Sequence, residues 1–190
     1  VKYNENTGIS YKLFSAAYGS DSNYAAAGLV TMGGGNLSVR TGGDFLAQAG
    51  TFGKGDLSIY AGGNMKGRFL NMEGKGEIHS MGDFGDFNDI QSKGIQIELF
   101  KSQMNITAMG EIQIAAVLNP TLASDKTHIS RMNDDFVNCT YNEETSISLT
   151  AGNDVIIAGV APLYHNKKAY QIAETVLPAT VNVEAGGDIS

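Results

Sequence analysis

The chain is poor in cysteine and in positive charge and has no long apolar run, and each shortage excludes a class of protein. Cys139 is the only cysteine among 190 residues, so no disulfide framework can form within the chain. Lys and Arg number 13 against 20 Asp and Glu, and the net charge of −7 argues against binding along a nucleic-acid backbone or on an anionic membrane. No run of about 18 apolar residues is present, so we expect no transmembrane segment.

Helix-forming patterns are also scarce, whereas glycine is abundant, at 24 residues. Each glycine weakens a helix interior by about 1 kcal/mol. Short stretches instead alternate with a period of two, as in residues 57–60, where Leu57 and Ile59 should point inward and Ser58 and Tyr60 outward. This alternation predicts β-strands.

A strand of this kind, followed by a glycine-rich corner, recurs along the chain. Clear copies lie at residues 37–45, 57–65, 147–155 and 181–189, and weaker copies lie at 78–84 and 106–112. Val39, Ile59 and Ile78 are equivalent positions, and Leu149 and Val183 follow at longer intervals, which indicates insertions. A fixed unit of about 20 residues predicts an all-β solenoid, in which each coil buries its apolar face on the next.

The spacing of the repeats divides the chain into parts. Residues 1–30 form a tyrosine-rich, irregular lead-in or the first coils, and residues 31–190 carry the repeats, with lateral insertions at 119–145 and 160–178. In the second insertion the steps of three from Tyr170 to Val176 predict a short helix. Because the chain starts and stops without capping segments, we expect a fragment of a longer rod, or a unit whose ends are covered.

Residues 43–50 and 55–64, with the two last copies, resemble the haemagglutinin-type repeats of filamentous haemagglutinin-like exoproteins from Gram-negative bacteria. The resemblance implies a right-handed parallel β-helix, two-partner secretion through an outer-membrane partner, and a secreted or cell-surface location. It also implies an adhesin, or a shaft that carries a toxin at its far tip, and it does not imply a catalytic site. The family's secretion-signal domain is not recognisable in residues 1–30, and the insertions at 119–145 and 160–178 depart from the generic repeat.

Acidic or amide residues close the corners and should form a ladder along one edge. They are Asp44, Asn64, Asp83, Glu111, Asp154 and Asp188. Carboxylates in a row suit calcium, whereas Asp and Asn after glycine commonly satisfy turn amides through Asx hydrogen bonds. The calcium-binding repeat of other β-rolls is absent, so we predict a structural ladder with no metal and no cofactor.

Other candidate chemistry is weak. Acidic residues gather at 83–89 and 134–144, and β-helical polysaccharide-degrading enzymes use carboxylate pairs. The cations available for an acidic sugar are Lys66, Arg68, Lys126 and Arg131. Nothing in the pattern fixes their geometry, and Cys139 has no triad context. The histidines, which lie far apart without ligand spacing, are His79, His128 and His165. We therefore expect no enzymatic activity.

Exposed aromatic residues on the insertions are the best candidates for recognition, because loops on a rigid scaffold tend to carry function. Tyr141, Tyr164 and Tyr170 either cover the flank of the rod, which the pattern favours, or contact a glycan or protein on another cell. The leading hypothesis is thus a structural and adhesive segment of a surface-displayed exoprotein. The alternatives are a self-assembling fibre subunit that stacks through open coil ends and a β-helical polysaccharide-degrading enzyme.

Overall fold

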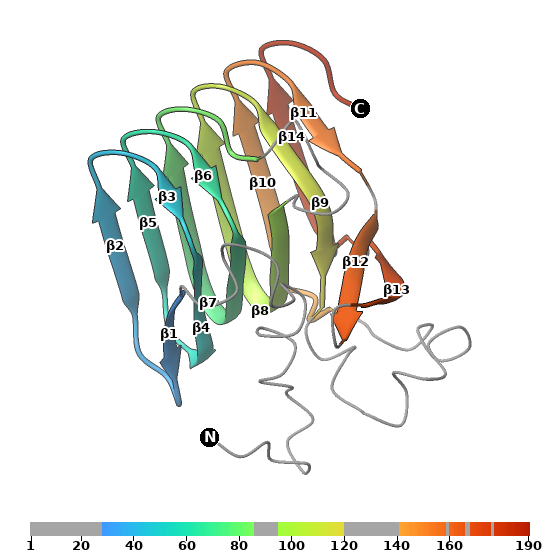
Figure 1. The fold of residues 1–190 in the computed structure, drawn as a ribbon. Helices are drawn as coiled ribbons and strands as arrows, with labels where there is room; N and C mark the ends of the chain where they lie inside the picture. The colour runs from blue at the N-terminus through green and yellow to red at the C-terminus, as the bar shows by residue number, and fades with distance from the viewer. Residues whose placement is uncertain (1–27, 86–94, 120–140, 159, 166–167, 176) are drawn as a thin grey trace.

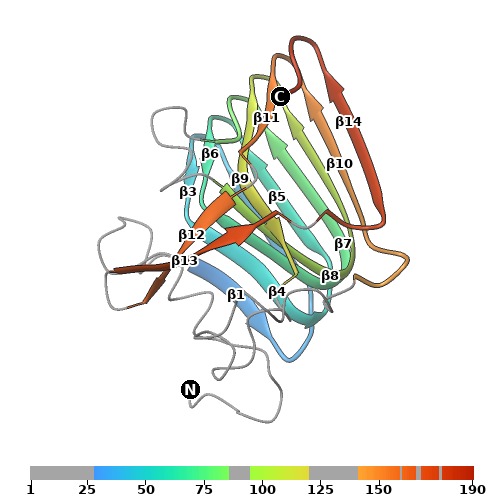
Figure 2. The same cartoon turned by 90° about the vertical axis from the view of Figure 1, so that its right-hand side faces the viewer.

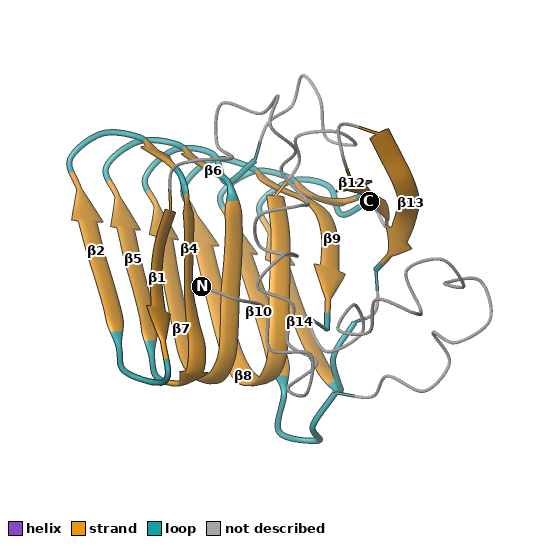
Figure 3. Cartoon of the chain, turned by 60° about the horizontal axis from the view of Figure 1, so that its bottom comes forward, coloured by secondary structure: helices purple, strands orange, loops and turns teal. Residues whose placement is uncertain are grey.

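The computed structural model of the chain describes residues 28–85, 95–119, 141–158, 160–165, 168–175 and 177–190. These described residues are mostly β-strand and contain no helix (Figure 3). In chain order the strands are β1 (Gly28–Met32), β2 (Leu37–Thr41), β3 (Phe45–Leu46), β4 (Gln48–Lys54), β5 (Leu57–Ala61), β6 (Met65–Lys66), β7 (Arg68–Ser80), β8 (Ile95–Ala108), β9 (Ile112–Leu118), β10 (Ser146–Ala151), β11 (Val155–Ile157), β12 (Val160–His165), β13 (Lys168–Glu174) and β14 (Thr180–Ala185).

The repeated alternating strands form one row of parallel strands, called row A. It runs through β2, β5, residues 76–80 of β7, residues 104–108 of β8, β10 and β14. One register position of the row is occupied by Val39, Ile59, Ile78, Ile106, Leu149 and Val183. The equivalence predicted from the sequence spacing is therefore confirmed.

Two further rows complete the arrangement. Row B is short and contains β3, β6, Phe84, the start of β9, β11 and Ile189. Row C contains β1, β4, residues 68–73 of β7, residues 96–101 of β8 and the end of β9. The chain passes from row A through row B to row C and returns to row A, and one such passage is called a repeat. Figure 1 shows β3 and β6 beside β2 and β5, and Figure 2 shows the row A strands side by side.

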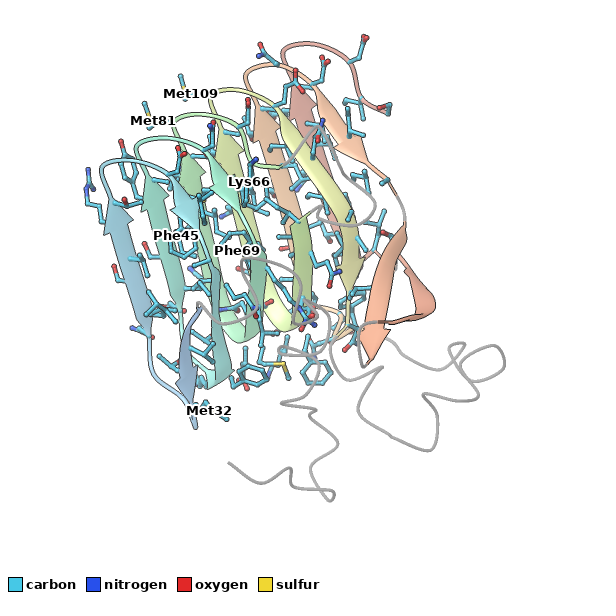
Figure 4. The ribbon with its side chains drawn as sticks, in the orientation of Figure 1. Met32, Phe45, Lys66, Phe69, Met81 and Met109 are labelled. Atoms are coloured by element: carbon cyan, nitrogen blue, oxygen red, sulfur yellow. The ribbon has the colours of Figure 1, made fainter. Side chains whose placement is uncertain are left out.

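The alternation within row A is confirmed in β5, where Leu57 and Ile59 are buried, Ser58 is exposed and Tyr60 is half-buried. Inward side chains from all three rows share one hydrophobic core. In this core the ring of Phe69 stacks on Phe84 with centroids 5.3 Å apart, and Figure 4 shows Phe69 in the interior. No single repeat can bury such rings alone, so the core depends on stacking of neighbouring repeats.

At one inward position of row A, a glycine, which has no side chain, lies beside a methionine, which has a long one. Leu57, Gly76 and Met104 follow one another in register. A Cβ atom built on Gly76 would lie 2.2 Å from the Sδ atom of Met104. The flexible thioether therefore fills the space that glycine leaves open.

Replacing Met104 by alanine should lower the free energy of unfolding by about 3–5 kcal/mol, because Gly76 has no side chain with which to close the cavity. Chemical denaturation measures this change. Met109 is the matched control, because its side chain is 61% exposed and its replacement by alanine should cost less than about 0.5 kcal/mol. Equal losses for the two variants would contradict this packing.

The helix predicted within residues 160–178 is wrong. β12 and β13 form an antiparallel hairpin in which Val160 lies opposite Glu174 and His165 opposite Lys168. The prediction relied on the spacing of three residues between Tyr170 and Val176 and did not take Ile172 into account. The β-branched side chain of Ile172 favours a strand. Of the other predicted segments, residues 1–27 and 120–140 lie outside the described residues, and β1 begins inside the predicted lead-in.

Candidate functional site

The predicted ladder residues lie where the chain leaves row A, and their side chains reach from one repeat to the next. Asp44 Oδ1 accepts a hydrogen bond from the backbone N–H of Asn64 at 2.8 Å. Asn64 Oδ1 accepts one from the N–H of Asp83 at 2.8 Å, and Asp83 Oδ1 accepts one from the N–H of Glu111 at 3.0 Å. We call these contacts the corner ladder. Unlike a local Asx turn, it joins equivalent residues of neighbouring repeats.

Where a ladder oxygen of one repeat reaches the next repeat, the residue before the next ladder residue has to be glycine. The distances from a built Cβ atom to the ladder oxygen are 2.2 Å for Gly63 and Asp44, 2.2 Å for Gly82 and Asn64, and 2.0 Å for Gly110 and Asp83. Real Cβ atoms do not approach an oxygen this closely, so each ladder oxygen occupies the place of a side chain. A ladder residue in one repeat therefore demands glycine in the next.

The same rule accounts for the one interruption of the corner ladder among the described residues. Glu111 is one methylene longer than aspartate, and no hydrogen bond joins its side chain to the N–H of Asp154. The residue before Asp154 is Asn153 instead of glycine. The ladder resumes one repeat later, where Asp154 Oδ1 lies 2.7 Å from the N–H of Asp188 and glycine returns at Gly187.

Among the corner residues, Glu111 has a carboxyl group whose pKa is shifted. Desolvation, followed by the negative charges of Asp154 and Asp83, raises the pKa of its carboxyl group above the ordinary value of 4.5. The folded state therefore holds this proton to a higher pH than the unfolded chain does.

Glu111→Gln tests this electrostatic effect. A raised folded pKa contributes stability below the unfolded pKa, and that stability is lost as the pH rises through the folded pKa. The free energy of unfolding of the glutamine variant, relative to wild type, should therefore increase between about pH 4 and pH 7. Urea titrations at several pH values measure the difference. A difference that stays constant or narrows with rising pH would contradict the assignment.

A second ladder, which the sequence analysis missed, lies where the chain enters row A. Asn36 Oδ1 accepts from the N–H of Asp56 at 2.9 Å, and Asp56 Oδ1 accepts from the N–H of Lys75 at 2.9 Å. A Cβ atom built on Gly55 would lie 2.2 Å from the carbonyl oxygen of Gly35. The signal was a Gly-Asn or Gly-Asp pair immediately before two successive strands.

Both ladders use side-chain oxygens as acceptors for backbone N–H groups. These bonds hold successive repeats in register and satisfy amides that would otherwise lack partners at the corners. Among the described residues, no group of three or more His, Cys, Asp or Glu side chains could hold a metal ion. The arrangement is therefore suited to structural support.

The outward face of row A, called the polar face, is a regular surface that spans six paired strands. Its side chains carry hydroxyl, amide and charged groups, with one aromatic ring. They are Ser38, Arg40, Ser58, Tyr60, Glu77, His79, Asn105, Thr107, Ser148, Thr150, Asn182 and Glu184. All of them are exposed or half-buried.

Neighbouring side chains on the polar face interact along the row. Asn105 donates from Nδ2 to Glu77 Oε1 at 2.8 Å, and the Arg40 guanidinium lies 4.2 Å from the centre of the Tyr60 ring. Such contacts restrict the positions of the side chains that make them. The face is thus a pre-ordered array of hydrogen-bonding groups.

The middle of row C, residues 68–72 of β7 and 95–99 of β8, differs because it is buried on both faces. Its outward side carries Arg68 and Glu98, which form an ion pair with side chains at most 3% exposed. Leu70 and Met72 are buried on the same side. The β12–β13 hairpin contacts the end of this row at β9. Sequence reasoning expected alternation and overlooked this row, although its continuous apolar runs are typical of strands covered on both faces.

The predicted tyrosines fall in two settings. Tyr141 is half-buried and packs against the core, and burial raises the pKa of its hydroxyl group. Tyr164 lies on β12 and Tyr170 on β13, but their side chains are outside the described residues. The structure therefore brings Tyr164 and Tyr170 onto one hairpin and places Tyr141 elsewhere.

The structure describes only some of the residues considered for sugar chemistry; of these, Asp83 and Lys66 lie on neighbouring repeats, where Met65 donates its N–H to the carbonyl oxygen of Asp83 at 2.8 Å. Arg68 is buried against Glu98 and does not line a groove. Asp86, Asp89 and the acidic residues 134–135 lie outside the described residues, as do His128 and Cys139.

No protein-family model, curated protein or solved structure matches the chain. No helix in the described residues is long and apolar enough to cross a membrane.

Proposed function

We propose that the chain is a segment of a right-handed parallel β-helix that serves as the shaft of a secreted or cell-surface adhesin. The observation that carries this proposal is the stack of repeats whose three rows keep a common register around one core. Crossovers between parallel strands are right-handed in about 98% of cases, which supports the handedness. The resemblance of residues 43–50 and 55–64 to haemagglutinin-type repeats supports adhesion and export through an outer-membrane partner.

The polar face is the receptor-binding surface in this proposal. Its hydroxyl and amide groups match the hydrogen-bonding needs of a glycan or a polar protein surface, and the Arg40 guanidinium over the Tyr60 ring adds a cationic group. Parallel strands about 4.8 Å apart hold these groups rigidly, so little order is lost on binding. Tyr164 and Tyr170, on the β12–β13 hairpin, are proposed as a separate contact region.

Binding of the purified chain to a glycan array and to host cells tests this function. We expect saturable binding that weakens about tenfold or more when Tyr60 and Asn105 are both replaced by alanine. Met109→Ala, on the exposed corner, is the control and should bind like wild type. The proposal fails if wild type binds neither target, or if the polar-face variant binds as tightly as the control.

A further inference from the structure

Two methionines lie exposed at the corner where the chain leaves row A. The side chain of Met81 is 48% exposed and that of Met109 is 61% exposed, and Figure 4 shows both at the outer edge of successive corners. Neither side chain belongs to a hydrophobic cluster of the described residues. The core therefore does not account for a large apolar side chain at either position.

The two methionines occupy equivalent positions in consecutive repeats. Ser80 and Ala108 are register partners at the end of row A, and a methionine follows each of them. Met81 donates its N–H to the carbonyl oxygen of Ala61 at 3.0 Å. Met109 donates its N–H to that of Ser80, also at 3.0 Å. Because neighbouring parallel strands lie about 4.8 Å apart, the two side chains start from backbone positions one strand spacing apart.

The backbone of the corner does not explain the pair either. In the other described repeats the equivalent positions are all glycine, namely Gly42, Gly62, Gly152 and Gly186. A Cβ atom built on any of the last three would lie 2.1–2.4 Å from a carbonyl oxygen of the preceding repeat. The corner thus favours glycine, and two consecutive repeats depart from this pattern with the same long side chain.

The pair presents two thioether sulfur atoms in a negatively charged setting. Asp83 and Glu111 each lie two residues beyond a methionine, and no lysine or arginine occurs in residues 80–85 or 108–113. Thioethers are soft ligands that select Cu(I) over harder divalent ions. A methionine side chain has three rotatable bonds, so two that start one strand spacing apart can turn toward one ion. The nearby carboxylates favour a cation at this place.

We propose that Met81 and Met109 bind one soft monovalent metal ion of the Cu(I) class through their two sulfur atoms. Two side chains form too small a surface for a protein partner, which needs about 800 Å² on each side of an interface. The proposed ion is held from two successive repeats and joins them at the corner. The site lies outside the polar face, so metal binding and receptor binding are separate properties and are measured separately.

Titration with Ag(I), a redox-stable soft ion of the same charge as Cu(I), tests the proposal, with the methionine methyl signals followed by NMR. Cys139 is replaced by serine in every sample, because a thiol would compete for the ion. We expect the signals of Met81 and Met109 to shift together and to saturate at one ion per chain. Met32 is the control within the same sample, because it is 51% exposed but its register partner is Phe52, which has no sulfur. Its signal should not shift at that ratio.

Replacement of one methionine tests whether the two sulfur atoms act together. In Met81→Leu, half-saturation of the Met109 signal should need about tenfold more Ag(I), because a second sulfur no longer holds the ion. Met32→Leu should leave the titration unchanged, and the signal of the buried Met104 should show that the fold persists in both variants. Zn(II) should shift neither signal of the pair.

Three results would overturn the proposal. The first is a response of Met81 and Met109 that is no stronger than that of Met32. The second is an unchanged Met109 titration in Met81→Leu, which would show that each sulfur acts alone. The third is a shift of both signals by Zn(II) as large as that caused by Ag(I), which would show that softness does not decide binding.

Discussion

Replacing Gly110 by alanine is expected to lower the free energy of unfolding by about 2–3 kcal/mol, although the position lies at a corner outside the core. The new Cβ atom would lie 2.0 Å from Asp83 Oδ1, which accepts the N–H of Glu111. The carboxylate must leave this position, so a charge-assisted hydrogen bond between repeats is lost. Urea denaturation followed by circular dichroism measures the loss.

Asp83→Ala provides the second arm of a double-mutant cycle. With the carboxylate gone, Gly110→Ala should cost less than about 1 kcal/mol, giving a coupling of about 1.5–2 kcal/mol between the two sites. Asn153→Ala is the matched control at the interrupted step, where no ladder oxygen occupies the space, and should change stability by less than about 0.5 kcal/mol. Additive effects of the Asp83 and Gly110 substitutions would contradict the steric rule.

Breaking the buried ion pair should have an even larger effect. Glu98→Leu removes the carboxylate that the buried Arg68 guanidinium contacts, and the expected loss in the free energy of unfolding is about 3–5 kcal/mol. Replacing both residues, as Arg68→Met with Glu98→Leu, removes the buried charge and should recover most of that loss. Thermal and urea unfolding of the single and double variants provide the comparison.

A second ion pair on the same two strands supplies the control. Lys101 Nζ lies 3.7 Å from Glu73 Oε1, but both side chains are about 40% exposed. Solvent screens this pair, so Glu73→Leu should cost no more than about 1 kcal/mol. If Glu73→Leu and Glu98→Leu destabilise the chain equally, the outward face of row C is not buried in solution.

The sequence was sufficient to predict the parallel rows where alternation and spacing coincide. Val39, Ile59 and Ile78 recur at nearly constant intervals, and each has polar neighbours that mark the outward face. The corner residues could be aligned for the same reason. Their hydrogen-bond partners could not be predicted, because an Asp or Asn side chain can accept from an N–H group of its own turn or of the next repeat. Which of the two it reaches depends on the distance between neighbouring repeats.

Other features depend on contacts between distant segments. The middle of row C shows no alternation because both of its faces are buried, so residues 68–72 and 95–99 gave no recognisable strand pattern. The pairing of Arg68 with Glu98 follows from the register of β7 on β8 across residues that carry no repeat signal. The β12–β13 hairpin was mistaken for a helix because its short segments fit more than one period.

Amide hydrogen exchange by NMR tests the stacking of repeats through the corner ladder most directly. The account predicts slow exchange for the N–H groups of Asn64, Asp83, Glu111 and Asp188, and faster exchange for Asp154 at the interrupted step. In Asp83→Ala only the Glu111 N–H should become fast among the ladder amides. Equal protection of Asp154 in wild type, or an unchanged Glu111 rate in Asp83→Ala, would contradict it.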